Sequence, residues 1–489
     1  MEAKSKQNRF PAFLAALIVF ALIKLLLPAT KGLTQDGVTF LAVFVSTIIL
    51  LMVCKDCMFP CFYALGMMGA MNLVNTANIF TASYGSTTCA IMIAVFVITY
   101  AMDKTGLTEY IAKWFLSRPS IKGHPYTFLA YAILAEIVIS AFIDPFMAIF
   151  SIMPIGKSIL ERLGFTKKHN VYKAFLMTLL WLPGFVQLIF PFGKSMTLLM
   201  EGYATGFGYS FDLGAYVAMA GAICLAISAA SILIFALICK PEKDKFNNYD
   251  PEEIKSELLE KPLTKQGKFV AIIVFVTFIC LAFPYFGAFG VVSDYMAKWS
   301  SIIPYYLAVI LLACVPIEGH AVVEPMEAAP KINWPMVMMP SVIMMFSSFV
   351  GKEEFGVTAW ISNMLSPVTQ SVSPAVLLLV AVCAVIALTN ITSNMATLAI
   401  GVTIFTPVFI GLYNSGESFV HPVCVIIGLS IGANISYLLP SCAPAPAAIY
   451  GSGDLSIKES LPCNIAAVFV GIAIVYVGII LFSVAGIFA

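Results

Sequence analysis

Charged side chains are scarce in this 489-residue sequence, where Lys, Arg, Asp and Glu make up 11% and hydrophobic residues 60%. A soluble domain carries about 25% charged residues, because water must solvate its surface. The composition therefore excludes an ordinary soluble protein and predicts an integral membrane protein. The net charge of +1 gives no indication of a nucleic-acid partner.

The groups that enzymes use are also sparse. The sequence contains only four histidines, His124, His169, His320 and His421, and none has the spacing of a metal-ligand set. We find no nucleophile–base set and no nucleotide-binding loop. We therefore expect neither an enzyme nor a bound cofactor, and a sodium ion is the only accessory ion that the sequence suggests.

The cysteines allow one alternative. Cys54, Cys57 and Cys61 form a Cys-x2-Cys-x3-Cys cluster among 12 cysteines, so a zinc or redox site is conceivable. No histidine lies near the cluster, and most other cysteines are scattered in apolar segments. The favoured interpretation is small apolar residues in a reducing compartment.

Long apolar runs, in contrast, are abundant. A membrane-spanning helix needs about 20 largely apolar residues, and suitable runs lie near 10–28, 37–54, 59–76, 87–102, 214–239, 267–287, 302–316, 334–350 and 461–488. Two further pairs of segments resemble the arms of re-entrant hairpins: 125–143 with 147–160, and 375–391 with 396–412. Two more segments, 171–200 and 420–450, are each broken near the middle by Pro with Gly or Ala.

Positive charge is distributed unevenly between the expected loops. If the N-terminus is cytoplasmic and each hairpin returns to its own side, the cytoplasmic loops hold 22 of the 27 Lys and Arg residues. Such an excess is typical of the cytoplasmic side of membrane proteins. The sequence therefore predicts a multi-pass protein of the plasma membrane with a cytoplasmic N-terminus.

Two polar breaks interrupt apolar segments at matched positions. One lies at Asp144 and the other at Ser393, 249 residues later, and the same 249 residues separate Pro191 from Pro440. Lipid cannot hydrogen-bond a backbone, so such breaks must be buried in protein or line a watery cavity. The repeated offset predicts two inverted halves with a binding site at their interface, as in secondary transporters.

The second break supplies the clearest candidate site. Ser393, Asn394 and Thr397 offer hydroxyl and amide groups at a hairpin tip, and the helix that begins there presents N–H groups to an anion. Thr389, the Asn394 oxygen and the carbonyls that end the first arm could bind sodium. These residues could instead merely cap helix ends. So many polar groups within an apolar segment favour a functional site.

At this point the chain resembles a known family. The segment Ser393–Thr397 looks like the Ser-Asn-Thr hairpin tip of the divalent anion/sodium symporters, which carry dicarboxylates, citrate or sulfate. Residues Leu439–Gly453, which include Pro444, are similar to that family's Pro-rich loop with its Tyr/Phe-Gly-x-Gly ending. The resemblance covers the whole chain in segment order. It implies a homodimer, substrate at Ser393 and Asn394, and one sodium near Thr389 and Asn394.

The resemblance also implies an elevator, in which a transport domain slides past a scaffold domain. The fold class expected is an all-α polytopic membrane protein with the following division: scaffold 1–104 and 267–355, and transport domain 105–239 and 356–489. The transport domain would contain hairpins 125–160 and 375–412 and broken spans 171–200 and 420–450. Short Trp-bearing segments, 105–117 and 356–366, suit helices in the membrane interface. Segment 240–266 would form a cytoplasmic linker, either helical or simply solvated.

The first half departs from the family pattern. Where the family has another Ser-Asn-Thr, this chain has Asp144-Pro145-Phe146, and Ser140–Asp144 looks like the hairpin of related arsenite and sodium/proton transporters. An intramembrane carboxylate suggests function, and Lys194 is its candidate partner. Lys194 could pair with Asp144 in place of sodium. It could instead attract a substrate carboxylate while Asp144 takes a cation, or the pair could be purely structural.

Other polar residues extend this candidate site. Glu136 lies two turns before Asp144 on the same expected helix face, so it could relay protons, extend the cation site or only hydrogen-bond a neighbouring helix. Gln187 could reach the substrate. The residues expected at the substrate are Ser393, Asn394, Thr397, Lys194, Ser195 and Pro444. Those expected at the coupling cation are Asp144, Ser140, Thr389, Asn394 and Glu136.

The sequence thus predicts a secondary active transporter of a small di- or tricarboxylate. Coupling to sodium or protons and exchange both remain open, with the bilayer and a second copy as partners. Within transporters, a sodium/proton antiporter or an arsenite permease is the alternative, because of Asp144. A passive anion channel is the alternative from another class, since channels also contain re-entrant hairpins.

Overall fold

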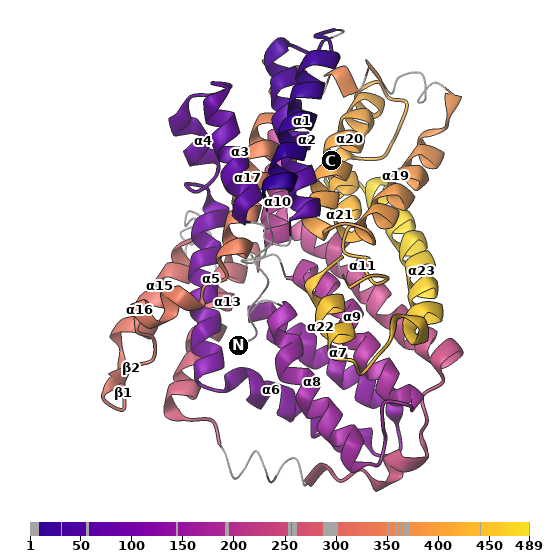
Figure 1. Cartoon of the computed structure of the whole chain (residues 1–489). Coiled ribbons are helices and arrows are strands. Elements are labelled where there is room, and N and C mark those ends of the chain that lie inside the picture. The colour runs from indigo at the N-terminus through magenta and orange to yellow at the C-terminus, as the bar shows by residue number, and fades with distance from the viewer. Residues whose placement is uncertain are drawn as a thin grey trace.

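The computed structural model of the protein is almost entirely helical (Figure 1). It describes residues 9–488 except 31, 55–57, 143–144, 191–194, 253–255, 257–261, 287–301, 351, 358, 362, 365–370 and 441. Two of the predicted site residues, Asp144 and Lys194, lie outside the described residues.

The helices of the first half follow one another with short connections. They are α1 Phe10–Leu26, α2 Gln35–Val53, α3 Met58–Ala70, α4 Thr76–Ala82, α5 Thr87–Lys104, α6 Leu107–Leu116, the 3₁₀ turn Pro119–Ile121, α7 Pro125–Phe142, α8 Pro145–Arg162, α9 Asn170–Ile189, α10 Ser195–Gly206 and α11 Leu213–Ile234, which continues as a π-helical turn to Cys239. The helices of the second half are α13 Lys265–Phe286, α15 Ile302–Cys314, α16 Pro325–Ala328 with the 3₁₀ turn Ala329–Lys331, α17 Trp334–Val350, α19 Pro374–Thr389, α20 Asn394–Asn414, α21 Pro422–Gly432, α22 Pro444–Gly451 and α23 Ile457–Val484.

The expected hairpin arms and broken segments are present as helices. Helices α7 and α8 pack together, as do α19 and α20. The segment expected at 171–200 is α9 followed by α10, and the segment expected at 420–450 is α21 followed by α22. The expected run at 59–76 is shorter than predicted: α3 ends at Ala70, because Asn72 adopts a positive φ of 51° that no helix accommodates.

The first short Trp-bearing segment is confirmed as a separate helix. Helix α6 lies at 66° to α5, and Gly106 between them has a φ of 70°, a left-handed conformation that favours glycine. The second such segment, 356–366, falls partly outside the described residues. Its described part begins at Gly356, which also has a positive φ.

Four of the described helices are long and apolar enough to cross a membrane: α9, α11 with its π turn, α20 and α23. The bent pair of α5 and α6 could make a fifth. These helices differ in burial: 89% of the most apolar stretch of α9 is buried inside the protein, but only 28% of the corresponding stretch of α23. Helix α9 therefore lies at the centre of the helical assembly and α23 at its periphery.

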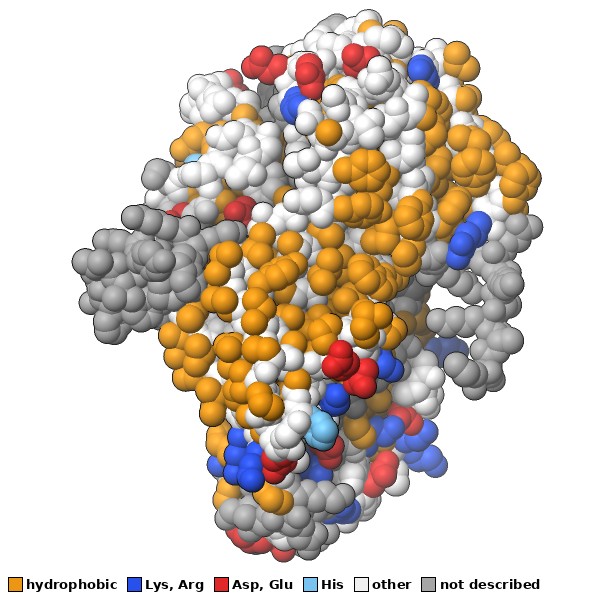
Figure 2. All heavy atoms as spheres, turned by 90° about the vertical axis from the view of Figure 1, so that its left-hand side faces the viewer, with side chains coloured by type: hydrophobic (Ala, Val, Ile, Leu, Met, Phe, Trp, Pro, Cys, Tyr) orange, Lys and Arg blue, Asp and Glu red, His pale blue; other side chains and the backbone are white. Residues whose placement is uncertain are grey.

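One face of the molecule presents an apolar band. Figure 2 shows hydrophobic side chains across the middle of this face, with most acidic and basic side chains gathered toward its two ends. Helices α13 and α15 carry large exposed apolar residues, such as Ile272, Phe275 and Ile310. Such a band would be costly in water and is typical of a surface that faces lipid.

A small strand pair departs from the all-helical expectation. Strand β1, Pro316–Ile317, pairs antiparallel with β2, His320–Ala321. Glu318 and Gly319 join the strands with φ values of 57° and 89°. Two consecutive positive φ values are typical of the tight turn that closes a two-residue hairpin.

The linker between the halves is anchored to the first half. Its 3₁₀ turn Asp244–Asn248 buries Phe246, and the Tyr249 hydroxyl donates to the Leu116 carbonyl. Glu242 accepts hydrogen bonds of 2.9 Å from the backbone N–H groups of Asn170 and Val171 at the start of α9. The segment is therefore neither a free solvated chain nor, over 244–248, an α-helix; residues 253–255 and 257–261 lie outside the described part.

Ion pairs join the first half to the loop before α23 and to the first turn of that helix. Lys157 on α8 and Lys167 both bind the Asp454 carboxylate, and Lys173 on α9 lies 2.9 Å from Glu459. Burial alone would raise the pKa of Asp454, but the two lysines outweigh it and hold that pKa below its usual range.

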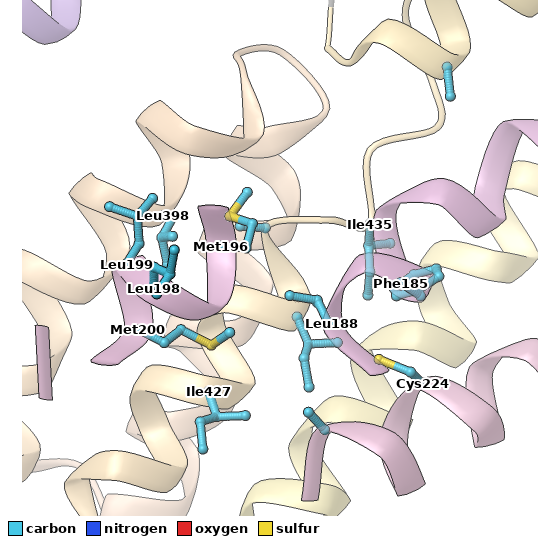
Figure 3. Close-up of a cluster of buried hydrophobic side chains, with 14 of the residues drawn as sticks. Phe185, Leu188, Met196, Leu198, Leu199, Met200, Cys224, Leu398, Ile427 and Ile435 are labelled. Atoms are coloured by element: carbon cyan, nitrogen blue, oxygen red, sulfur yellow. The ribbon is translucent and has the colours of Figure 1, made fainter. Parts of the chain in front are cut away.

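The broken segments of both halves share one apolar core. Figure 3 shows Phe185 and Leu188 of α9 clustered with Met196 of α10, Leu398 of α20 and Ile427 of α21. All four helices end or begin at a break. Side chains remote in the sequence thus fix where the breaks lie relative to one another.

Candidate functional site

The turn between α19 and α20 forms a polar hairpin tip. Helix α19 ends at Thr389 and α20 begins at Asn394, with Ser393 as its N-cap. The Ser393 hydroxyl accepts from the Ala396 N–H at 3.3 Å, and the hydroxyls of Thr392 and Thr397 lie 2.8 Å apart. Ser393 is half-buried and Thr397 fully buried. Ser393 therefore does cap a helix, which is the alternative to a binding role, and the Thr397 hydroxyl is paired with that of Thr392.

Asn390, in the same turn, holds the break of the following helices. Its Nδ2 donates to the carbonyls of Ile386 and Ile435 at 2.8 Å, and its Oδ1 accepts from the N–H groups of Tyr437 and Leu438 at 2.9 and 3.0 Å. An unwound backbone has orphan polar groups that must be satisfied when buried. Asn390 satisfies three of them in the segment between α21 and α22.

A row of buried polar side chains runs from the hairpin tip into the first half. The Thr389 hydroxyl lies 3.1 Å from Asn394 Oδ1 and also contacts the Ala433 carbonyl. Asn394 Nδ2 donates to Asn434 Oδ1 at 3.1 Å, and Gln187 Nε2 donates to the same oxygen at 2.8 Å. The row therefore connects α19, α20, the end of α21 and α9, and all four side chains are buried.

The close approach of α9 and the α21 end requires a glycine. A Cβ on Gly184 would lie 2.8 Å from the Asn434 carbonyl oxygen, well inside the normal contact distance. Gln187, one turn later on α9, reaches Asn434 only because the two backbones come this close. The break at the end of α21 in the second half is thereby brought against α9 of the first half.

A second buried network lies on the other side of Tyr437. The Trp181 indole donates to Asn464 Oδ1 at 2.8 Å, and Asn464 Nδ2 donates to the Tyr437 carbonyl at 3.0 Å. The Tyr450 hydroxyl donates to that same carbonyl at 3.0 Å. Helices α9, α22 and α23 are thus all fastened to the segment that Asn390 also holds.

The predicted residues of the first half are only partly described. Ser140 donates to Glu136 Oε1 at 3.2 Å within α7, and both residues are fully buried. Ser195 is the first residue of α10, and Pro444 is the exposed first residue of α22. Whether Asp144 and Lys194 meet is a question that falls outside the described residues.

Sequence reasoning assigned no role to Asn390 or Asn434. Each of these two asparagines places a carboxamide beside or within an apolar run, and this could have indicated a role, since polar groups at such depth usually have a specific partner. The sequence left open whether Gln187 reaches the substrate, and the structure places its amide on Asn434. Among the described residues, no group of three His, Cys, Asp or Glu side chains could hold a metal ion, and Cys57 of the cysteine cluster is not described.

The chemistry of this site suits hard cations and anions. Hydroxyl, amide and carbonyl oxygens surround the hairpin tip, and such oxygens bind hard cations such as sodium without a thiolate or imidazole. The first N–H groups of α20 begin at the same tip and provide a partial positive charge for an anion. One hairpin tip can therefore serve both a cation and a carboxylate.

Comparison with known proteins agrees with this chemistry. The chain is 23% identical over 429 residues to the sodium-dependent dicarboxylate transporter SdcS of Staphylococcus saprophyticus, covering 81% of this chain and 77% of that protein. It is 28% identical over 162 residues to the Na(+)/citrate cotransporter of Rattus norvegicus, covering 32% of this chain and 27% of the cotransporter. It is also 29% identical over 129 residues to human solute carrier family 13 member 1, covering 26% of this chain and 20% of that protein.

The family comparison extends over nearly the whole chain. Residues 8–486 match the model of the sodium:sulfate symporter transmembrane region. That range contains every helix described above, including both candidate hairpins. The chain therefore belongs to the sodium:sulfate symporter family, the divalent anion/sodium symporters that its hairpin tip resembles.

Proposed function

We propose that the protein is a sodium-coupled secondary transporter of a small di- or tricarboxylate. The observation that carries this proposal is the buried row of Thr389, Asn394, Asn434 and Gln187 at a hairpin tip, inside an apolar helical assembly. Burying such polar groups is costly unless they have partners or a ligand. The names of the relatives, a dicarboxylate transporter and a citrate cotransporter, support the substrate class.

Membership in a family of transporters confirms that the chain is not an enzyme. Apolar helices and family together make it a multi-pass membrane protein. The plasma membrane and a cytoplasmic N-terminus remain part of the proposal, supported by the 22 of 27 Lys and Arg residues in loops on one predicted side.

The substrate would lie between the α19–α20 tip and the broken segments. Ser393, Asn394 and the start of α20 would bind one carboxylate, with Ser195 and Pro444 lining the break on either side. Thr389, Asn394 and the carbonyls that end α19 would bind one sodium. Thr397 would support the tip through its 2.8 Å contact with Thr392. Lys194 would attract the second carboxylate, or pair with Asp144.

Alternating access would follow from the division into scaffold and transport domains, as in an elevator, within a homodimer. The ion pairs of Asp454 and Glu459 support this division, as do the hydrogen bonds from the Asn390 and Asn464 side chains to the backbone between α21 and α22. They join helices of 105–239 to helices of 356–489, or fasten the breaks within them. These segments would therefore move as one inverted-repeat body relative to 1–104 and 267–355.

Proton coupling is the second candidate, and the buried Glu136 favours it. Its carboxyl lies within α7 and accepts from Ser140, close in sequence to Asp144. An intramembrane carboxyl of this kind is often part of a proton or cation pathway. In that case the protein would resemble a sodium/proton antiporter or arsenite permease in its coupling. A passive anion channel would lack coupling altogether.

Reconstituted protein separates these functions. Proteoliposomes should take up labelled succinate, 2-oxoglutarate or citrate in a saturable manner, driven by an inward sodium gradient. A proton gradient and internal counter-substrate are varied in turn, and Glu136→Gln removes the proton site. Absence of carboxylate uptake under every regime would refute the proposal, whereas uptake that does not saturate would indicate a channel.

The sodium site has its own matched pair of variants. Thr389→Ala should raise the sodium concentration for half-maximal uptake about tenfold, since one lost polar interaction is worth about 1.4 kcal/mol. Thr277→Ala is the control, because Thr277 is also buried and, within the described part of the chain, its hydroxyl bonds the Ile273 carbonyl of its own helix α13. Equal sodium dependence of the two variants would exclude Thr389 from the cation site.

A further inference from the structure

The break at the end of α21 leaves a backbone carbonyl without its helical partner. In a continuing α-helix the Ser430 carbonyl would accept from the N–H of Asn434, four residues later. That N–H instead donates to the Ile431 carbonyl at 3.0 Å, because the helix ends at Gly432. The side-chain Nδ2 of Asn434 takes over, donating to the Ser430 carbonyl at 2.8 Å.

This bond fixes which way the Asn434 amide faces. A backbone carbonyl can only accept, so the NH₂ group of Asn434 must face Ser430 and its Oδ1 must face away. On that other side, two NH₂ groups converge on Oδ1: Asn394 Nδ2 at 3.1 Å and Gln187 Nε2 at 2.8 Å. Turning the Asn434 amide over would oppose donor to donor twice and oxygen to oxygen once. Only one orientation satisfies all three contacts.

The orientation of Asn434 in turn determines that of Asn394. Since Asn394 Nδ2 faces Asn434, its Oδ1 faces Thr389 and the end of α19, where its distance to the Thr389 hydroxyl is 3.1 Å. A hydroxyl has one hydrogen, and Thr389 has a second acceptor within reach, the Ala433 carbonyl. Thr389 can therefore keep a hydrogen bond when a cation takes Asn394 Oδ1.

We infer that Asn434 is a positioning residue for the coupling cation. The Ser430 carbonyl at the end of α21 orients the Asn434 amide, and Asn434 in turn orients the Asn394 amide. The Asn394 oxygen, and not its NH₂ group, therefore faces the sodium site. This inference rests on the proposed sodium-coupled transport, but it assigns a role to a residue that would not itself bind ion or substrate. A cation site lined by an inverted amide would be repulsive, so the orientation of Asn394 decides whether the site binds at all.

Asn434→Ala tests this role. The variant removes the acceptor that orients Asn394, and partners behind a metal ligand typically change affinity about 10- to 100-fold when lost. We expect that rise in the sodium concentration for half-maximal carboxylate uptake, and a matching loss of sodium-dependent thermal stabilisation in detergent. Gln187→Leu is the contrast, because Ser430 still holds Asn434 in place. Its sodium constant should shift less than about threefold, the effect of one weak hydrogen bond.

A second variant at position 394 tests whether Asn434 orients the Asn394 amide or only packs against it. In Asn394→Asp both side-chain positions are oxygens, so no orientation is needed. Asn434→Ala should then no longer raise the sodium constant in that background, because it also removes the Asn434 oxygen that opposes the new carboxylate. Equal shifts in the two backgrounds, or equal shifts from Asn434→Ala and Gln187→Leu, would overturn the inference.

Two further arms keep the test independent of folding and of the proposed function. Asn434→Asp keeps an acceptor for Asn394 but opposes an oxygen to the Ser430 carbonyl, so it should retain sodium affinity even though it is less stable. A tenfold loss of affinity in that variant would also overturn the inference. If the unaltered protein takes up no carboxylate, the proposed function fails, while sodium-dependent melting of the same variants still decides the role of Asn434.

Discussion

Asn390 supports the break between α21 and α22, and its removal should destabilise the protein. In Asn390→Ala, the Ile435 carbonyl and the N–H groups of Tyr437 and Leu438 lose their side-chain partner. A buried polar group left unsatisfied costs about 1–3 kcal/mol. Three such groups give a loss of about 3 kcal/mol at the lower end of that range.

The loss is measured as the free energy of unfolding in a denaturant titration of the detergent-purified protein. Asn414→Ala is the matched control, because Asn414 is the exposed last residue of α20 and a surface substitution changes stability by about 0.5 kcal/mol or less. Sodium and carboxylate are omitted so that ligand binding does not contribute. Equal unfolding free energies for the two variants would refute the stabilising role of Asn390.

Two other changes follow from the same contacts. Gly184→Ala would place a Cβ 2.8 Å from the Asn434 carbonyl oxygen and should destabilise the protein by about 1–3 kcal/mol. Gly221→Ala should not, because no other described segment lies within 4 Å of its Cβ position. The melting temperatures of the two variants test this difference. Asp454→Asn should lose about 1–2 kcal/mol at pH 7, less than a fully buried pair because its lysine partners remain partly exposed. Since the folded pKa of Asp454 lies below its usual value of 3.8, this contribution is present above that pH and disappears as the pH falls through the folded pKa. A deficit that stays constant on acidification would contradict that origin.

Much of the helical plan could be predicted from the sequence alone. The arms 125–143 and 375–391 correspond to α7 and α19 within one or two residues at each end. Apolar runs of this length have few alternatives to a helix, because a membrane offers the backbone no hydrogen-bond partners. The break at Ser393 was equally visible, since hydroxyl and amide groups stand out against an apolar sequence.

The partners of the polar groups could not be predicted in the same way. Nothing in the local sequence shows that Asn390 holds residues 435–438, or that Gln187 meets Asn434 from 247 positions away. Those contacts depend on how closely two helices approach, and Gly184 permits that approach. The contacts of the linker were unpredictable for a related reason: its charges are typical of a solvated segment, but Glu242 caps α9 and Phe246 is buried.

The sequence by itself thus determined the membrane class, the helical segments, the two breaks and the family resemblance that the family match confirms. These properties depend on composition and local order, which the chain carries wherever it folds. Only the tertiary structure decided which amide faces which carbonyl. That choice depends on the orphan Ser430 carbonyl at a helix end and on side chains brought there from three other helices, and so it exists only once the halves have packed together.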